Sequence, residues 1–261
     1  MKIATWNVNS IKTRLPHVLD WCARSTPDIL LLQETKTVDE GFPRLELEAA
    51  GYHTAHFGQK SYNGVAILSR FPIIEAIRGL PGDPEQGEAR YLEACIRSSD
   101  GPETIRVASV YVPMGQSVES DRFPFKLKFL DGLRARAQDL LYNREAFVLG
   151  GDFNVAFDSN DVYDPKLFED KVLFHPEERR RLRGLVYLGL TDAVRTLSKE
   201  AGLYSWWDYR AGGWEHDHGL RIDHLLLSPR IADMLKTAGI DRAPRGLERP
   251  SDHAPVWCDI S

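Results

Sequence analysis

The chain contains 261 residues, of which 43% are hydrophobic and 27% are charged, and its formal net charge is −5. This composition is typical of a globular protein with a large core, and the absence of linkers, low-complexity runs and repeats favours one domain over residues 1–261. The net charge argues weakly against nucleic-acid binding, which usually requires a basic surface, unless a cation neutralises several carboxylates.

No targeting or membrane segment is expected. The first ten residues, MKIATWNVNS, alternate apolar and polar side chains like a half-buried strand and contain no long apolar region or cleavage site. No run approaches the roughly 20 apolar residues that a membrane span requires. The three cysteines, Cys22, Cys95 and Cys258, are far apart, which fits a reduced, cytoplasmic protein and argues against a disulfide or zinc framework.

Short apolar segments along the chain predict strands. In chain order they are residues 28–34, 63–69, 104–112, 146–154, 222–228 and 255–260. Helical periodicity occurs at Leu15, Val18, Leu19 and Cys22, along a face formed by Phe123, Leu127, Leu130, Leu133, Ala137 and Leu141, and after Pro176. Apolar runs without alternation indicate sheets that are covered on both faces. We therefore predict a layered α/β sandwich of two packed mixed β-sheets flanked by helices.

Polar side chains occur where these strands end. They are Asn7, Glu34, Tyr111, Asp152, Asn154, Asp223, Asp252 and His253. Each has an ordinary explanation: a solvated strand end for Glu34, an amide that bonds the backbone for Asn7, and a core aromatic for Tyr111. An Asp/Asn turn explains GGDFN (150–154) about as well as a functional site does, and a turn onto the last strand explains Asp252 and His253.

Taken together, this set favours chemistry on phosphate. Four carboxylates and two amides are oxygen-rich ligands, which favour Mg²⁺ or Mn²⁺ over zinc. The sequence contains neither a GxxxxGK(S/T) nucleotide loop nor a GxSxG nucleophile motif. A cation, an acid that orients water and a histidine that meets negative charge indicate a phosphodiester hydrolase.

Seven segments, in this order, resemble the exonuclease III family of AP endonucleases, a branch of the endonuclease/exonuclease/phosphatase superfamily. They are TWNVNSI, PDILLLQETK, GVAILSR, GGDFNVA, DVYDP, GLRIDHLL and PSDHAPV, and they extend over essentially the whole chain. The resemblance implies a four-layered α/β sandwich and Mg²⁺-dependent cleavage of double-stranded DNA 5′ to abasic sites, with Mn²⁺ as an alternative ion. It also implies 3′-5′ exonuclease or phosphodiesterase action on blocked 3′ ends.

The same resemblance implies a role for each strand-end residue. Glu34 would be the principal metal ligand, and Asp152 would orient or deprotonate the attacking water or protonate the leaving oxygen. Tyr111 and Asn154 would bind the scissile phosphate, and Asp223 would hold a cationic His253 beside it. The implied metal set is Glu34, Asn7, Asp152, Asn154, Asp252 and His253. The implied catalytic set is Asp152, His253, Tyr111, Asn154 and Asp223.

The aromatic segment 204–223 carries the substrate prediction. By resemblance, Trp206 lines a pocket for the abasic sugar whose apolar walls are Leu220 and Ile222, which a strand period of two places on one face. A small hydrophobic pocket accepts a sugar without its base and excludes an intact nucleotide. The alternative, which we favour for Trp207, is that these tryptophans cover a sheet edge.

Basic residues in loops are expected to contact the DNA backbone. Lys60 and Arg90 are the main candidates, and Lys36, Lys166 and Lys171 are further ones; solvated surface charge is an equally good explanation for any one of them. The segment HDH (216–218) is expected to be a surface loop, because two histidines and one acid fall short of a metal site.

Two other functions stay open. A phosphodiesterase of the same fold would act on a non-DNA phosphoester, such as an inositol phosphate, with the same metal and phosphate residues. A non-enzymatic DNA-binding protein on this fold is disfavoured because every expected catalytic position is filled. We expect a cytoplasmic monomer that acts on double-stranded DNA with abasic sites or blocked 3′ ends and has no membrane partner.

Overall fold

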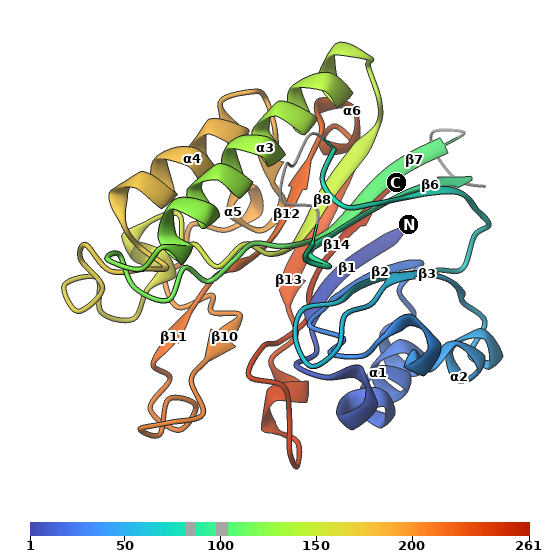
Figure 1. Cartoon of the computed structure of the whole chain (residues 1–261), viewed down its shortest axis with the longest axis horizontal. Coiled ribbons are helices and arrows are strands. Elements are labelled where there is room, and N and C mark those ends of the chain that lie inside the picture. Colours follow the sequence, from blue (N-terminus) through green and yellow to red (C-terminus); the bar gives the residue numbers. More distant parts are fainter. Residues whose placement is uncertain (82–86, 98–103) are drawn as a thin grey trace.

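Two six-stranded mixed β-sheets form the centre of the computed structural model, which describes residues 1–81, 87–97 and 104–261 (Figure 1). In spatial order, the first sheet contains β13 (Leu235–Ile240), β14 (Val256–Ile260), β1 (Lys2–Asn7), β2 (Ile29–Gln33), β4 (Val65–Ser69) and β3 (His53–Phe57). The second contains β5 (Ile73–Arg78), β6 (Tyr91–Arg97), β7 (Thr104–Tyr111), β8 (Phe147–Asp152), β12 (Asp223–Leu227) and β9 (Thr191–Asp192). A separate short pair consists of β10 (Trp206–Trp207) and β11 (Gly219–Leu220).

Helices cover the outer face of each sheet and complete four layers (Figure 1). On the first sheet lie α1 (Ile11–Ser25) and α2 (Arg44–Ala49), and on the second lie α3 (Arg122–Tyr142) and α4 (Pro176–Val186). The shorter elements are α5 (Ala193–Leu197), α6 (Pro229–Ala232) and the 3₁₀ turns η1 (Asp39–Gly41), η2 (Ser159–Asp161) and η3 (Ala243–Gly246). The predicted four-layered α/β sandwich is confirmed.

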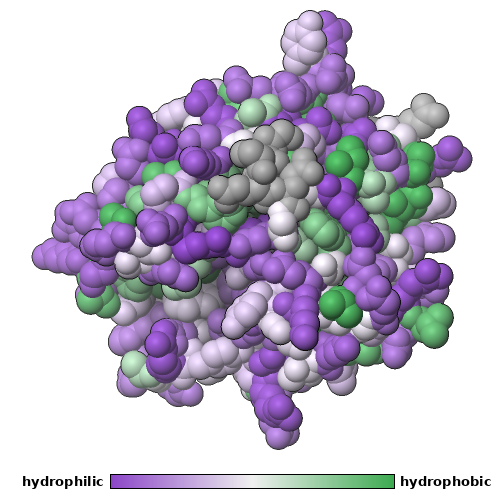
Figure 2. All heavy atoms as spheres, viewed as in Figure 1, coloured by the Kyte–Doolittle hydropathy of each residue, from purple (hydrophilic) through white to green (hydrophobic). Residues whose placement is uncertain are grey.

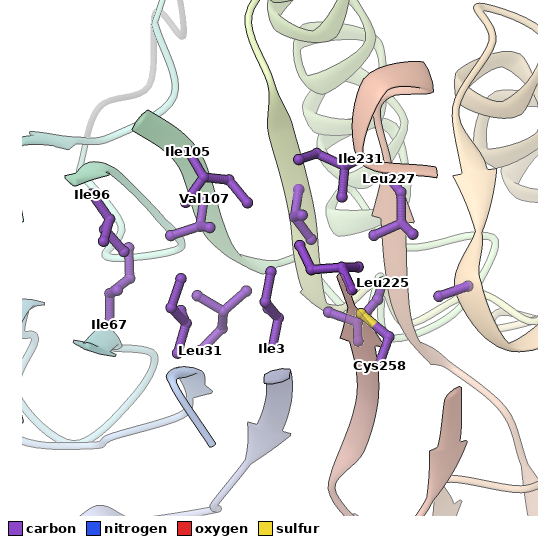
Figure 3. Close-up of a cluster of buried hydrophobic side chains, with 14 of the residues drawn as sticks. Ile3, Leu31, Ile67, Ile96, Ile105, Val107, Leu225, Leu227, Ile231 and Cys258 are labelled. Atoms are coloured by element: carbon purple, nitrogen blue, oxygen red, sulfur yellow. The ribbon is translucent and has the colours of Figure 1, made fainter. Parts of the chain in front are cut away.

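The main hydrophobic core lies between the two sheets (Figure 3). Ile3 and Leu31 from the first sheet belong to one buried cluster with Val107 and Leu225 from the second. Full burial of each such side chain contributes about 1.5–3 kcal/mol. This core fixes the two sheets against each other and so determines where their strand ends meet.

The first strand differs from its prediction. Its alternation predicts a half-buried strand, but all residues of β1 from Ile3 to Asn7 are buried. Gln33 Nε2 donates to Thr5 Oγ1 at 3.0 Å in the same sheet and to Ser109 Oγ at 2.9 Å in the other sheet. A polar layer whose hydrogen bonds are satisfied between the sheets therefore produces an alternation that resembles a solvated face.

The six predicted apolar strands are confirmed as β2, β4, β7, β8, β12 and β14. The sequence did not predict β3, β5, β6 and β13 or the two-residue strands β9, β10 and β11; among these, β3, β5, β9 and β13 are the edges of the two large sheets. Edge strands expose part of their surface, so no apolar run identifies them.

The long helix α3 is rotated slightly from the predicted face. Phe129 and Leu140 are buried, whereas the predicted Leu127 and Leu141 are only half-buried. The buried face also contains a lysine, Lys126, which an apolar pattern cannot predict.

The face shown in Figure 2 is mainly hydrophilic. Figure 2 shows hydrophobic residues only in small, separate groups on the face that it presents. Among the residues that the structure describes, no helix combines the length and the apolar character needed to cross a membrane.

The strand ends converge on one side of the fold. β1 runs parallel to β2 and β7 runs parallel to β8, so the carboxyl ends of each pair lie together. β12 runs antiparallel to β8 and places Asp223 opposite Asp152. β1 also contacts β8 across the core, which brings the polar ends of both sheets to one place.

Candidate active site

Two carboxylates from different sheets share one amide donor. Asn7, at the end of β1, donates from Nδ2 to Glu34 Oε1 at 2.8 Å and to Asp152 Oδ2 at 2.9 Å. Glu34 follows β2 with a left-handed backbone (φ 51°), and Asp152 ends β8. Ligand atoms of Glu34, Asp152 and His253 lie within 4.8 Å of one another. Four of the predicted strand-end residues, Asn7, Glu34, Asp152 and His253, are thus brought together in one acidic cluster.

His253 is a buried cation between two aspartates. Its Nδ1 lies 2.9 Å from Asp223 Oδ2, and its Nε2 lies 3.7 Å from Asp152 Oδ2. Burial alone would lower the pKa of His253, but the charges of Asp223 and Asp152 outweigh it and raise the pKa to about 10. The ring is therefore protonated at neutral pH. An imidazolium has no free lone pair for a metal, so this state favours the predicted donor role over the predicted ligand role.

The pKa of Asp152 is also raised, which for a carboxyl group favours the neutral form. Burial raises the pKa of Asp152 to about 7, and the charge of Asp223 acts in the same direction. The charge of His253 and the hydrogen bond from the Asn7 amide lower this pKa but do not outweigh burial. A carboxyl group that titrates near neutral pH is suited to accept a proton from water.

The cluster fits a hard divalent cation. Glu34 and Asp152 bring like charges close to a single amide, an arrangement that a cation stabilises. Lys36 Nζ already lies 2.8 Å from Glu34 Oε2 and supplies part of the positive charge. Because the nearest donors are carboxylate oxygens, the donor set suits Mg²⁺ or Mn²⁺ better than zinc.

Two predicted metal ligands are engaged with other partners. Asn7 Oδ1 accepts from Asn9 N at 3.0 Å, so the amide nitrogen faces the carboxylates. Asp252 accepts from Asn9 Nδ2 and from Trp206 Nε1, each at 3.0 Å. In this structure both residues orient their neighbours, and their roles as metal ligands stay predictions.

Asn154 and Tyr111 border the cluster. The Asn154 backbone is left-handed (φ 50°), its N–H donates to Asp152 Oδ1 at 2.9 Å, and its Nδ2 donates to Val112 O at 2.9 Å. Burial, followed by the charges of Glu34 and Asp152, raises the pKa of Tyr111 well above its ordinary value, so the phenol keeps its proton. Their contacts with a phosphate, and Asn154 as a metal ligand, stay predictions.

A hollow of about 330 Å³ opens beside Glu34 and Tyr111. Arg90 lines it, and its guanidinium lies 4.7 Å from the centre of the Tyr111 ring while donating to Glu88. Lys60 is exposed next to Gln59, another residue of this hollow. Both residues are therefore placed near the acidic cluster, and their contact with DNA stays a prediction.

The further basic candidates are spread over the surface. Lys36 is paired with Glu34, Lys166 lies at a hollow beside Glu169 and Asp170, and Lys171 borders the hollow that contains Trp206. Lys171 is thus the one of these three that faces the predicted substrate pocket.

The hollow that contains Trp206 has a volume of about 440 Å³ and shares Met114 with the hollow beside Glu34. Leu220 and Ile222 form one apolar cluster with Trp206, as the strand period predicts. They are 0% and 2% exposed, however, and they do not line the hollow. Its apolar walls are Met114, Tyr163, Phe168, Val172, Leu173 and Trp206. The predicted walls therefore support the pocket from within the core.

Trp207 is a structural residue, whereas His216 and His218 lie on the surface and His218 lines the hollow that contains Trp206. Trp207 is fully buried, packs edge-on against Trp214 at 4.9 Å, and donates from Nε1 to Asp217 Oδ1 at 2.9 Å. His216 and His218 are exposed, as expected of a surface loop, and His218 stacks on Tyr163 at 4.4 Å.

A sequence profile described as the Endonuclease/Exonuclease/phosphatase family matches residues 4–253. The chain belongs to this family. It is 35% identical over 269 residues to Exodeoxyribonuclease III from Haemophilus influenzae, with 100% of both chains covered.

Solved structures agree with this assignment. The fold is similar to that of the 3′ phosphatase NExo from Neisseria bound to a product DNA hairpin, with a TM-score of 0.95 and 40% identity over 100% of this chain and 99% of that chain. It is also similar to an AP endonuclease from Archaeoglobus fulgidus, with a TM-score of 0.94 and 35% identity over 100% and 99% of the two chains. The predicted family and the prediction of a hydrolytic nuclease are confirmed.

Arginine and tyrosine side chains that the sequence did not single out form buried or backbone-directed contacts around the site. Arg14 Nη2 and the Tyr209 hydroxyl both donate to Pro250 O, at 2.9 and 2.7 Å, and thereby fix the loop before His253. Arg221 is fully buried and donates from Nε and Nη2 to the Asp161 carboxylate at 2.8 and 3.1 Å. The position of Arg221 between the apolar residues Leu220 and Ile222 is the sequence feature that could have indicated its buried ion pair with Asp161.

The charge of Asp223 is expected to keep His253 protonated. In the metal-free enzyme, Asp223→Asn should lower the pKa of His253 by at least about one unit, equivalent to about 1.4 kcal/mol, because its nearest negative charge is removed. Titration of the ring protons by NMR measures this shift. The matched variant Asp252→Asn should cause a smaller shift. An unchanged pKa in Asp223→Asn would contradict the charge assignment.

Proposed function

We propose that this enzyme is a metal-dependent DNA repair nuclease that cleaves the phosphodiester bond 5′ to abasic sites in double-stranded DNA and also trims blocked 3′ ends. The observation that carries the proposal is the position of Asp152 between the Glu34 carboxylate and the His253 cation. The similar proteins support the substrate, since they include an Exodeoxyribonuclease III, an AP endonuclease and a 3′ phosphatase bound to DNA.

In the proposed reaction, Asp152 orients a water molecule and accepts its proton as the water oxygen attacks phosphorus. The bond from phosphorus to the 3′ oxygen breaks, and that oxygen leaves as a hydroxyl once it is protonated. The perturbed pKa of about 7 allows Asp152 to act as this base near neutral pH.

Positive charge and fixed donors stabilise the transition state. His253, protonated and held by Asp223, donates to a non-bridging phosphate oxygen as negative charge develops there. Tyr111 and Asn154 add neutral donors. Mg²⁺, or Mn²⁺ as the alternative, would be held mainly by Glu34 with Asp152 beside it, and would withdraw charge from the phosphate.

The proposed abasic pocket is the hollow that contains Trp206. Its aromatic and aliphatic walls suit the apolar face of a sugar that lacks its base, and Lys171 on its rim suits a backbone phosphate. We include a single-domain, monomeric enzyme in the proposal. A cytoplasmic location is included because all three cysteines are free thiols, as in reducing compartments.

Product analysis with and without metal tests this proposal. With Mg²⁺, the enzyme should cut a synthetic abasic duplex to leave a 3′ hydroxyl and should remove nucleotides from a blunt duplex. EDTA should abolish both activities, because it removes the divalent cation that Glu34 and Asp152 would hold against the phosphate. Cleavage that is insensitive to EDTA would contradict the metal requirement. Hydrolysis of an inositol phosphate without cleavage of DNA would favour the alternative substrate class.

The pocket assignment predicts a specific loss in Trp206→Ala. Removal of the indole should lower kcat/KM on abasic duplexes at least about tenfold, or about 1.4 kcal/mol. Trp206→Phe retains an aromatic wall but loses the hydrogen bond to Asp252, so it should stay within about threefold of the parent if the ring provides the effect. Equal losses in both variants would assign the role to the hydrogen bond instead.

A further inference from the structure

A lysine with no exposed surface lies behind the active site. Lys126 belongs to the buried face of α3 and is 0% exposed. Its Nζ lies 2.7 Å from Asn154 O, 3.1 Å from Met114 O and 2.6 Å from Glu178 Oε1, and Glu178 is also 0% exposed. The ammonium group therefore donates two hydrogen bonds to loop carbonyls and forms an ion pair with the Glu178 carboxylate.

The two carbonyl groups belong to the loops on either side of the catalytic cluster. Asn154 lies two residues after Asp152, and its left-handed backbone directs its N–H at the Asp152 carboxylate. Met114 lies three residues after Tyr111 and separates the two hollows. At Gly115 (φ 93°), an added Cβ would meet Lys126 Cδ at 3.2 Å. Both loops therefore close directly onto this one side chain.

Stability alone does not account for a buried ion pair here. Burial lowers the pKa of Lys126 and raises the pKa of Glu178, so the site resists both charges. Apolar residues of similar volume are frequently at least as stabilising as such a pair. Two apolar side chains in place of Lys126 and Glu178 could not donate hydrogen bonds to the carbonyl oxygens of Met114 and Asn154.

We propose that Lys126, whose buried charge Glu178 offsets, is a positioning residue that sets the spacing between the Tyr111–Met114 loop and the Asp152–Asn154 loop through its hydrogen bonds to the two carbonyls. Through this spacing it fixes the phosphate site, so the inference rests on the proposed hydrolysis of a phosphodiester. A displacement of about 1 Å among catalytic groups can lower a rate about 100-fold, so the loss of this tether should be visible in kcat.

Two variants separate positioning from stabilisation. Lys126→Met/Glu178→Leu removes both charges and keeps apolar volume, so its Tm should stay within about 4 °C of the parent. Its kcat on an abasic duplex should fall about 10- to 100-fold, with KM within about threefold.

Glu178→Gln keeps Lys126 and both carbonyl hydrogen bonds, so Tm should fall while kcat of the folded protein stays within about threefold. The exposed Lys128→Met on the same helix is the matched control and should change neither quantity.

Amide hydrogen exchange supplies a readout that does not depend on activity. Exchange in residues 112–116 and 152–155 should be faster in the double variant and unchanged in Glu178→Gln. A double variant with the parent kcat and exchange would overturn the proposal, as would loss of kcat in folded Glu178→Gln. If the double variant does not fold, Glu178→Gln alone decides. A parent enzyme without hydrolytic activity would contradict the proposed function, and the exchange rates would still test the tether.

Discussion

Glu34 and Asp152 come from different β-sheets, yet a single amide group on Asn7 binds both carboxylates. Much of the site follows from this concentration of negative charge at the place where the two sheets meet. The charge is balanced by the Lys36 ammonium on one side and by the buried imidazolium of His253 on the other. In the proposed reaction, a divalent cation would offset the remaining negative charge and so allow the anionic phosphate of a substrate to approach. This local balance also explains how a chain with a net charge of −5 can act on a polyanion.

The functional groups are held by strand ends and by buried polar contacts behind the loops. Asp152 and Asp223 are paired across adjacent strands, so their separation is set by the sheet itself. The loops beyond the strands need separate anchors, which are Lys126 for the Asn154 backbone and Arg14 for the segment that leads to His253. In each case a long basic side chain donates to backbone carbonyl oxygens. Such a contact depends on where the loop backbone lies and not on which side chain the loop residue carries.

The fold and much of the site could be predicted because the strands of this protein are apolar runs that end in polar residues. Asp152, Asp223 and His253 are adjacent in space for this reason. Contacts that depend on tertiary packing were not predictable: the amide of Asn7 faces the carboxylates with its nitrogen, and Asp252 is bound by Trp206. The burial of Leu220 and Ile222 also depends on tertiary packing, since residues 163–173 supply much of the apolar wall that the family resemblance assigned to these two side chains.

The role of His253 is the central claim, and the cleavage rate of His253→Ala tests it most directly. The rate constant would be measured on an abasic duplex at saturating Mg²⁺, with thermal unfolding to establish that the variant is folded. His216→Ala, which removes an exposed histidine, is the matched control. Loss of a buried cationic donor to the transition state should lower the rate about 1,000-fold, while the control retains the parent rate. A folded His253→Ala variant with a rate within about tenfold of the parent would contradict this account.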